Sequence, residues 1–167
     1  LAGLAAAGTA LPLRRADARS ITLALNEADN TGFEGVGYDR AGDRLFVVKE
    51  HSPRKLYEIH GIKRSLAGDM DIKIIDRQAW IDKLDMASDL SSVHFDEQTG
   101  HLVLLSDEAK MMLELDAEGE LVSFRSLWRG FAGLERSVPQ AEGMTFDAQG
   151  NLYLVSEPNL FYAFEHQ

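Results

Sequence analysis

Six oxygen-bearing side chains occupy matching positions in three segments of this chain, and together they could do chemistry. Most are carboxylates, and one is a hydroxyl. Carboxylate, carbonyl and water oxygens are the ligands of Ca²⁺, which takes six to eight of them. The set consists of Glu34, Ser91 and Glu142 at one position of the segment and of Glu50, Asp107 and Glu157 at another.

Like charges held close together repel, and a bound cation or raised pKa values must relieve that repulsion. The sharpest hypothesis is a Ca²⁺ or similar ion near Glu34, Glu142 and Glu157, with Glu50 as a further candidate ligand. In a second interpretation, the carboxylates accept hydrogen bonds from neighbouring backbone N–H groups and so lock one repeat to the next. A third interpretation is direct catalysis, and the sequence leaves all three open.

The elements that would position these side chains are internal repeats, which must be recognised before a fold is assigned. The repeats span residues 32–59, 89–116 and 140–166. The match is positional, with apolar residues aligned to apolar residues and aspartates to aspartates. Aligned sets include Tyr38, Phe95 and Phe146, then Asp39, Asp96 and Asp147, then Leu45, Leu102 and Leu152.

Each repeat predicts a β-hairpin, because alternating apolar residues flank a turn led by Asp and containing Gly: "DRAGDR", "DEQTGH" and "DAQGN". A third strand follows each time ("KLYEIH", "KMMLELD", "LFYAFEH"), and a more polar fourth follows twice ("DIKIIDR", "ELVSFRSLW"). Four antiparallel strands repeated about every 40 to 50 residues are typical of propeller blades. We therefore expect an all-β fold, a β-propeller of four-stranded antiparallel blades, with one short helical turn at 77–84.

The chain supplies about three blades, at 31–76, 89–127 and 140–166, whereas propellers close their ring with four to eight. Residues 1–30 are interpreted as an apolar lead-in and the outer strand (20–25) of a preceding or partner blade. Either the chain is part of a longer propeller, or a homodimer forms a six-bladed ring in which 20–25 completes the partner's last blade. The apolar run 1–13 is the remainder of a signal or anchor segment, or a loosely ordered lead-in.

Propeller geometry predicts that the six side chains meet at one mouth of the central channel. The first strand of each blade lines the channel and the second returns antiparallel, so the start of one and the end of the other share a face. Pro158 constrains the turn that follows, and the Asn159 amide should project above the mouth. We predict Ser91, Asp107 and Asn159 as ligand-binding residues, although hydrogen bonding at a strand end is the simpler role for Ser91.

Composition and missing motifs exclude several classes of function. The formal net charge is −10 and the basic residues form no stripe, so nucleic acid is not an expected partner. The chain has no cysteine, which excludes a disulfide scaffold, a thiolate zinc site and a cysteine nucleophile. No HExxH, GxSxG or glycine-rich phosphate loop is present, and so no enzyme class is indicated.

Several stretches of the chain are similar to one family. "GFEGVGYD", "DLSSVHFD", "HLVLLSDEAK" and above all "PQAEGMTFDAQGNLYLVSEPNLFYAF" resemble the SdiA-regulated (YjiK) family of bacterial envelope proteins. The resemblance covers about residues 32–164 and corresponds to the C-terminal half of a member. It implies a six-bladed propeller behind an N-terminal signal or membrane anchor, located in the periplasm or anchored to the inner membrane, with no established enzymatic activity.

Two functions fit these observations. The first is a non-enzymatic scaffold or binding module of the envelope, with a calcium ion at an acidic channel mouth and an unknown small ligand or envelope protein as its partner. The alternative is a calcium-dependent propeller hydrolase of esters, lactones or phosphoesters, in which Glu34, Glu142 or Glu157 would hold the metal. This alternative is an analogy at the level of the fold.

Overall fold

A computed structural model describes residues 16, 18–23, 32–50, 53–69 and 71–166 of the chain. The apolar run 1–13 and the last two residues of the expected strand 20–25 lie outside the described residues. The expectations for these segments therefore stay predictions.

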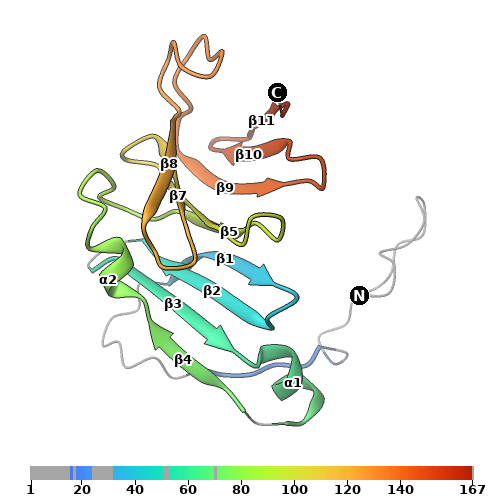
Figure 1. Cartoon of the computed structure of the whole chain (residues 1–167). Coiled ribbons are helices and arrows are strands. Elements are labelled where there is room, and N and C mark those ends of the chain that lie inside the picture. The colour runs from blue at the N-terminus through green and yellow to red at the C-terminus, as the bar shows by residue number, and fades with distance from the viewer. Residues whose placement is uncertain (1–15, 17, 24–31, 51–52, 70, 167) are drawn as a thin grey trace, which may run out of the picture.

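The described residues form three antiparallel sheets, which confirms the all-β fold class (Figure 1). Blade 1 consists of β1 (Phe33–Asp39), β2 (Arg44–Lys49), β3 (Lys55–His60) and β4 (Lys73–Asp76). Blade 2 consists of β5 (Ser92–Phe95), β6 (Leu102–Ser106), β7 (Met111–Leu115) and β8 (Leu121–Ser126). Blade 3 has three strands, β9 (Ala141–Phe146), β10 (Leu152–Ser156) and β11 (Leu160–Phe164). In each blade, neighbours in the sequence are neighbours in the sheet.

The first strands of the blades lie beside one another, because β5 contacts both β1 and β9 (Figure 1). Glycine makes the approach of β1 to β5 possible. A Cβ on Gly35 would lie 2.7 Å from the Cα of Ser92, and one on Gly37 would lie 3.1 Å from the Val93 oxygen. Because the first of these obstacles is backbone, a side chain at Gly35 would force the two strands apart.

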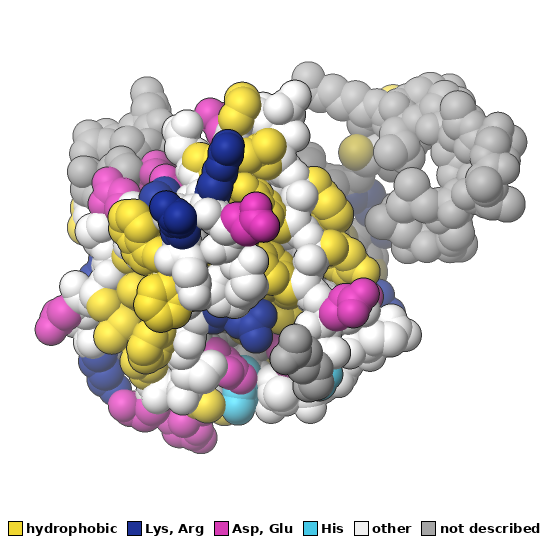
Figure 2. Space-filling model, turned by 90° about the horizontal axis from the view of Figure 1, so that it is seen from above, with side chains coloured by type: hydrophobic (Ala, Val, Ile, Leu, Met, Phe, Trp, Pro, Cys, Tyr) yellow, Lys and Arg dark blue, Asp and Glu magenta, His cyan; other side chains and the backbone are white. Residues whose placement is uncertain are grey.

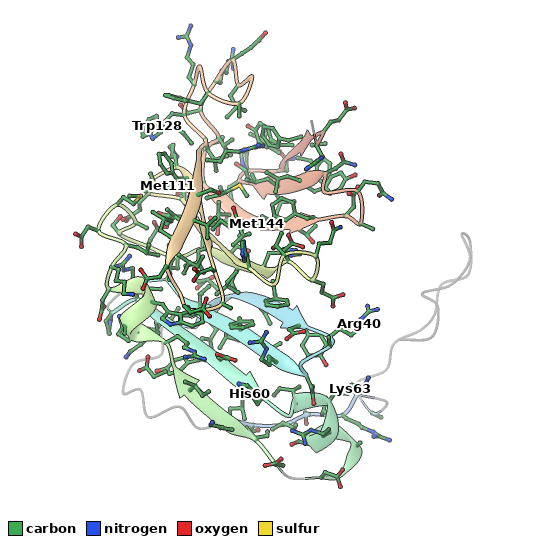
Figure 3. The ribbon with its side chains drawn as sticks, in the orientation of Figure 1. Arg40, His60, Lys63, Met111, Trp128 and Met144 are labelled. Carbon is green, nitrogen blue, oxygen red and sulfur yellow. The ribbon has the colours of Figure 1, made fainter. Side chains whose placement is uncertain are left out.

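Separate apolar clusters hold the blades together. One fills the space between blades 1 and 2 and includes Phe46, whose ring stacks on that of Phe95 at a centroid distance of 5.6 Å. The other lies between blades 2 and 3 and includes Leu105 and Leu154; Met144 packs against it (Figure 3). Full burial of one such side chain stabilises the fold by about 1.5–3 kcal/mol. Each blade is therefore held mainly by its neighbours, as expected of a repeat architecture.

The aspartates that lead the hairpin turns stabilise those turns, as the sequence predicts. Asp147 accepts hydrogen bonds from the backbone N–H groups of Gln149 and Asn151, both at 2.9 Å. Asp96 accepts one from the N–H of Gln98 at 2.8 Å. Such contacts mimic a backbone turn and explain why Asp recurs at this position.

The described residues contain two short α-helices. The helix α2 (Gln78–Ile81) lies within the helical turn expected at 77–84. The other, α1 (Ile62–Ala67), is not predicted from the sequence. Its N-terminus is capped from a distance, because the Asp43 carboxylate accepts hydrogen bonds from the N–H groups of Lys63 and Arg64. A reading of local sequence cannot detect a cap that comes from another hairpin.

Residues 18–23 run along the side of blade 1 that faces away from blade 2. The guanidinium of Arg19 donates a hydrogen bond to the Leu66 oxygen at 2.8 Å. Leu23 packs against a third apolar cluster, formed by Val47, Tyr57 and Ile59. The segment carries no strand hydrogen bonding, although 20–25 is predicted to be an outer strand.

A buried carboxylate ties the outer part of blade 1 together. Glu58 is 1% exposed and accepts hydrogen bonds from Arg77 Nε at 2.7 Å and from Arg44 Nη1 at 3.2 Å. Burial raises the pKa of Glu58, but the bonds and charges of the two arginines outweigh it and hold the pKa below its ordinary value of 4.5. Glu58 is therefore ionised in the fold at neutral pH.

Replacing this carboxylate tests its contribution to stability. Glu58→Gln should lower the free energy of unfolding by about 1.5–3 kcal/mol, because hydrogen bonds to a charged group are lost. The loss stays below the roughly 3–5 kcal/mol of a fully buried pair, because the arginine side chains are 30% exposed and water can solvate them. Urea unfolding at pH 7 measures the difference.

Glu120→Gln is the matched control, because its ion pair with Lys83 is exposed and worth at most about 1 kcal/mol. A depressed pKa contributes stability above the unfolded pKa, and that contribution is lost as pH falls through the folded pKa. The gap between wild type and Glu58→Gln should therefore shrink below about pH 4.5. A gap that stays constant down to pH 2 would contradict the assignment.

Candidate functional site

Two of the predicted acids sit at β-bulges in equivalent strands. In blade 1, Phe33 pairs with Lys49 and Gly35 with Val48, so Glu34 is the extra residue of β1. In blade 3, the pairing likewise shifts on either side of Glu142, which is the extra residue of β9. A bulge re-aims a side chain and bends the strand, and bulges are common next to functional sites. Glutamate followed by glycine, "EG", is the sequence signal that both bulges share.

The other three predicted acids follow the second strand of each blade directly. Glu50 follows β2, Asp107 follows β6 and Glu157 follows β10. Because the second strand runs antiparallel to the first, its end lies beside the bulge that begins the first strand. The five carboxylates Glu34, Glu50, Asp107, Glu142 and Glu157 form what we call the acidic cluster.

The electrostatic environment of Glu142 shows that the members of the acidic cluster lie close together. Partial burial raises the pKa of Glu142 above its ordinary value of 4.5. The negative charges of Glu157, Asp107, Glu50 and Glu34 raise it further, in that order. The structure thus brings together the side chains that the repeats align, at the mouth where the first strands begin.

Asp107 and Ser91 connect blade 2 to blade 3. The backbone N–H of Ala141 donates to Asp107 Oδ1 at 2.9 Å, and Ser91 Oγ donates to the Ala141 oxygen at 2.7 Å. Lys110 Nζ lies 3.4 Å from the same Asp107 oxygen. Ser91 and Ala141 are both buried. These contacts join the two blades in the way that the second interpretation describes, and we call them the interblade clamp. The ligand-binding role of Asp107 and Ser91 stays a prediction.

A further acid in the same region escapes sequence reasoning. Asp89 is fully buried and accepts hydrogen bonds from the N–H groups of Asp107, at 2.9 Å, and Glu108, at 3.2 Å. It also accepts one from the Ser106 hydroxyl. Asp89 therefore holds the turn that positions Asp107, but in the sequence it is one more polar residue ahead of a strand.

The turn between β10 and β11 carries the remaining predicted residue. The Glu157–Pro158 peptide bond is cis, and Asn159 follows it as an exposed residue. The N–H of Glu157 donates to the Gln140 oxygen at 2.9 Å, which ties this turn to the start of β9. The role of Asn159 in ligand binding stays a prediction.

Among the described residues, no three His, Cys, Asp or Glu side chains are arranged so that they could hold a metal ion. The acidic cluster gathers like charges without forming a ready-made coordination shell. The metal-binding role of Glu34, Glu50, Glu142 and Glu157 therefore stays a prediction. Across the same residues, no helix is both long and apolar enough to cross a membrane.

Comparison with known proteins supports the fold. A family model described as SdiA-regulated matches residues 5–165. The chain is similar to a chain of a nidogen/laminin complex, with a TM-score of 0.53 at 14% identity, over 78% of this chain and 43% of that chain. It is also similar to virginiamycin B lyase from Staphylococcus aureus, with a TM-score of 0.47 at 11% identity, over 83% of this chain and 43% of the other.

At 14% identity the likeness to the chain of the nidogen/laminin complex concerns the fold alone, and it supports the β-propeller fold. The chain spans less than half the length of each of these matched structures.

The interblade clamp can be tested with two substitutions at one position. Asp107→Ala leaves the buried Ala141 N–H without its acceptor and should lower the free energy of unfolding by about 1–3 kcal/mol. Asp107→Asn keeps an acceptor oxygen and should lose markedly less. Thermal or urea unfolding compares the two variants. Equal losses would mean that the charge of Asp107, rather than its hydrogen bond, holds blade 3.

Proposed function

The chain belongs to the SdiA-regulated family, and on that premise we propose that it is a non-enzymatic β-propeller binding module whose acidic cluster binds a calcium ion. The observation that carries the proposal is geometric: bulges at Glu34 and Glu142 and the ends of the second strands place five carboxylates at one mouth. Burial, and then the charges of the other four carboxylates, raise the pKa of Glu142 in agreement with this placement. An arrangement of like charges costs free energy in the absence of a counter-ion. A bound cation would neutralise part of the negative charge and relieve the repulsion, which would favour its binding.

The chemistry of the cluster favours calcium over a transition metal. All its donors are carboxylate oxygens, which suit hard cations, and no cysteine is available in the chain. In the proposed site the side chains of Glu34, Glu142 and Glu157 would have to turn toward a common ion, and the bulges at Glu34 and Glu142 and the strand end before Glu157 support this. Glu50 would supply a fourth carboxylate. Calcium tolerates irregular geometry and completes its shell with water, whereas magnesium demands a near-ideal octahedron.

Asp107 has a different place in this proposal. One of its oxygens already accepts the Ala141 N–H and lies near Lys110, so it contributes negative potential rather than a direct bond to the ion. The clamp and the cation site are then compatible, because they use different carboxylates.

We also propose that the module works in the bacterial cell envelope, where the family resemblance implies a periplasmic or membrane-anchored protein. Its partner would be a small ligand or another envelope protein that meets the mouth near Asn159. The hydrolase alternative needs the same ion and, in addition, turnover of an ester, lactone or phosphoester. No contact in the described part of the chain favours turnover over binding, so the experiment must separate the two.

Calcium titration tests the proposal directly. Calcium should raise the Tm of the wild-type chain, because a ligand at 100 times its Kd adds about 2.7 kcal/mol to the folded state. Glu142→Gln should lose most of this shift. Glu118→Gln, at an exposed position in the β7–β8 turn, is the matched control and should keep it. In the absence of calcium, Glu142→Gln should be at least as stable as wild type, because one repelling charge is gone.

The response should depend on pH with a defined sign. Calcium binds the ionised form of Glu142, whose pKa is raised above 4.5, so protonation competes with the metal as pH falls toward that value. The Tm shift should therefore be larger at pH 7 than at pH 5. The absence of any calcium response at pH 7 would refute the proposal, and ester hydrolysis that stops on chelation would support the hydrolase instead.

A further inference from the structure

The outer strand of blade 2 has a free edge in the middle of the described structure. Blade 2 has four strands, and described blades lie on both of its sides (Figure 1). Among the described residues, its outer strand β8 pairs with β7 alone. In a propeller the edge of the fourth strand faces outward from the ring, and further blades would be added beside blades 1 and 3. The free edge of β8 therefore does not depend on how the ring is completed.

This edge presents backbone groups that another strand can pair with. The N–H of Leu127 donates to the Lys110 oxygen, on the side of β7. Since the backbone groups of successive residues in a strand point to alternate edges, those of Phe124 and Ser126 point to the free edge. The pairing of β7 with β8 shifts at Val122, so the regular part of the edge follows that residue. An edge of this kind is a template for pairing with another chain.

The sequence of β8 does not protect its edge. Outer strands are commonly protected by short length and by charged side chains. The outer strand of blade 1, β4, is of this kind, because it has four residues and carries Lys73 and Asp76 at its ends. In contrast, β8 has six residues with one charge, at Arg125, and Phe124 is 61% exposed. Figure 2, which looks down from the top of Figure 1, shows hydrophobic side chains at the surface on the left, the side on which β8 lies in Figure 1.

One face of blade 2 carries a cation and an anion near this edge. Arg125 is exposed, and its guanidinium has no hydrogen-bond or ion-pair partner within the described ranges. Ser123 lies on the same face of β8, opposite Glu114 of β7, and its hydroxyl donates to that carboxylate at 2.5 Å. The hydrogen bonds from Ser123 and His101 hold the pKa of Glu114 below its ordinary value of 4.5. Glu114 is therefore ionised at neutral pH.

We propose that two copies of this chain pair edge to edge through β8, antiparallel and in a register centred on Phe124. Phe124 of one copy then lies opposite Phe124 of the other, and their outward backbone groups exchange both hydrogen bonds. Opposite residues of an antiparallel pair share a face, so the two aromatic rings contact each other, which stabilises the pairing. The contact is isologous, with a twofold axis perpendicular to the joined sheet.

Charge complementarity favours this register and a second copy as the occupant. Arg125 lies opposite Ser123 of the other copy, and so two strand spacings, about 10 Å, from the Cα of its Glu114. The two long side chains can span that distance together, and symmetry forms the contact twice. A register centred on Arg125 would instead set two guanidinium groups opposite each other, which is destabilising.

The mass of the chain in solution tests the pairing. Light scattering should give the wild-type chain twice the mass of one chain, and Phe124→Asp should reduce the mass to that of one chain. Ile74→Asp is the matched control, because Ile74 is an exposed apolar residue of the outer strand β4, and this variant should stay dimeric. Circular dichroism checks that both variants are folded. A wild-type mass other than that of two chains, or a dimeric Phe124→Asp variant, would overturn the proposal.

A charge exchange tests the register and the identity of the occupant. Arg125→Glu and Glu114→Arg should each give single chains, because each variant sets like charges against each other at both contacts. An equal mixture of the two variants should form a dimer with one copy of each, since every contact again joins opposite charges. A mixture that stays monomeric, or single variants that stay dimeric, would rule out this register. The edge of β8 lies away from the mouth, so these results do not depend on the calcium titration.

Discussion

The close approach of the first strands is the constraint on which the rest of the structure depends. Because Gly35 has no side chain, β1 can lie against the backbone of Ser92. The blades then fan out from a narrow centre, and their outer parts leave room for the apolar clusters between them. The same convergence gathers the strand starts at one mouth. Because Gly35 lets the first strands lie close together, the carboxylates near the strand starts are also brought together at the mouth.

The negative charges gathered at the mouth repel one another, and contacts within the fold offset part of that repulsion. The N–H of Ala141 and the ammonium of Lys110 contact the Asp107 carboxylate, and Asp89 accepts hydrogen bonds from the N–H groups of Asp107 and Glu108. Within the described part of the chain no group donates a hydrogen bond to Glu142, and burial, followed by the charges of the other carboxylates, raises its pKa. The mouth therefore has one part, around Asp107, that joins blade 2 to blade 3, and another, around Glu142, where negative charges lie near one another.

Much of this architecture follows from the sequence, because strand alternation and Asp-led turns are local signals. The alignment of Glu34 with Glu142 and of Glu50 with Asp107 and Glu157 predicted which acids would meet. The burial of Asp89 and the capping of α1 by Asp43 cannot be predicted from local sequence patterns, since both depend on contacts between distant segments. The clamp at Asp107 was anticipated as a type of contact, but its partner, the N–H of Ala141, was not.

The bulges at Glu34 and Glu142 affect which side chains of the mouth can be substituted during evolution. In a regular strand, successive side chains point to opposite faces of the sheet, and so toward one apolar cluster or the other. The extra residue of a bulge is not part of this alternation. Its side chain can be replaced without moving any core residue to the wrong side of the sheet. The middle repeat has Ser91 at the equivalent position, beside blades of the same design. At Glu34 and Glu142 the chemistry of the mouth is therefore largely separated from the packing, whereas Ser91 is buried and joins blade 2 to blade 3.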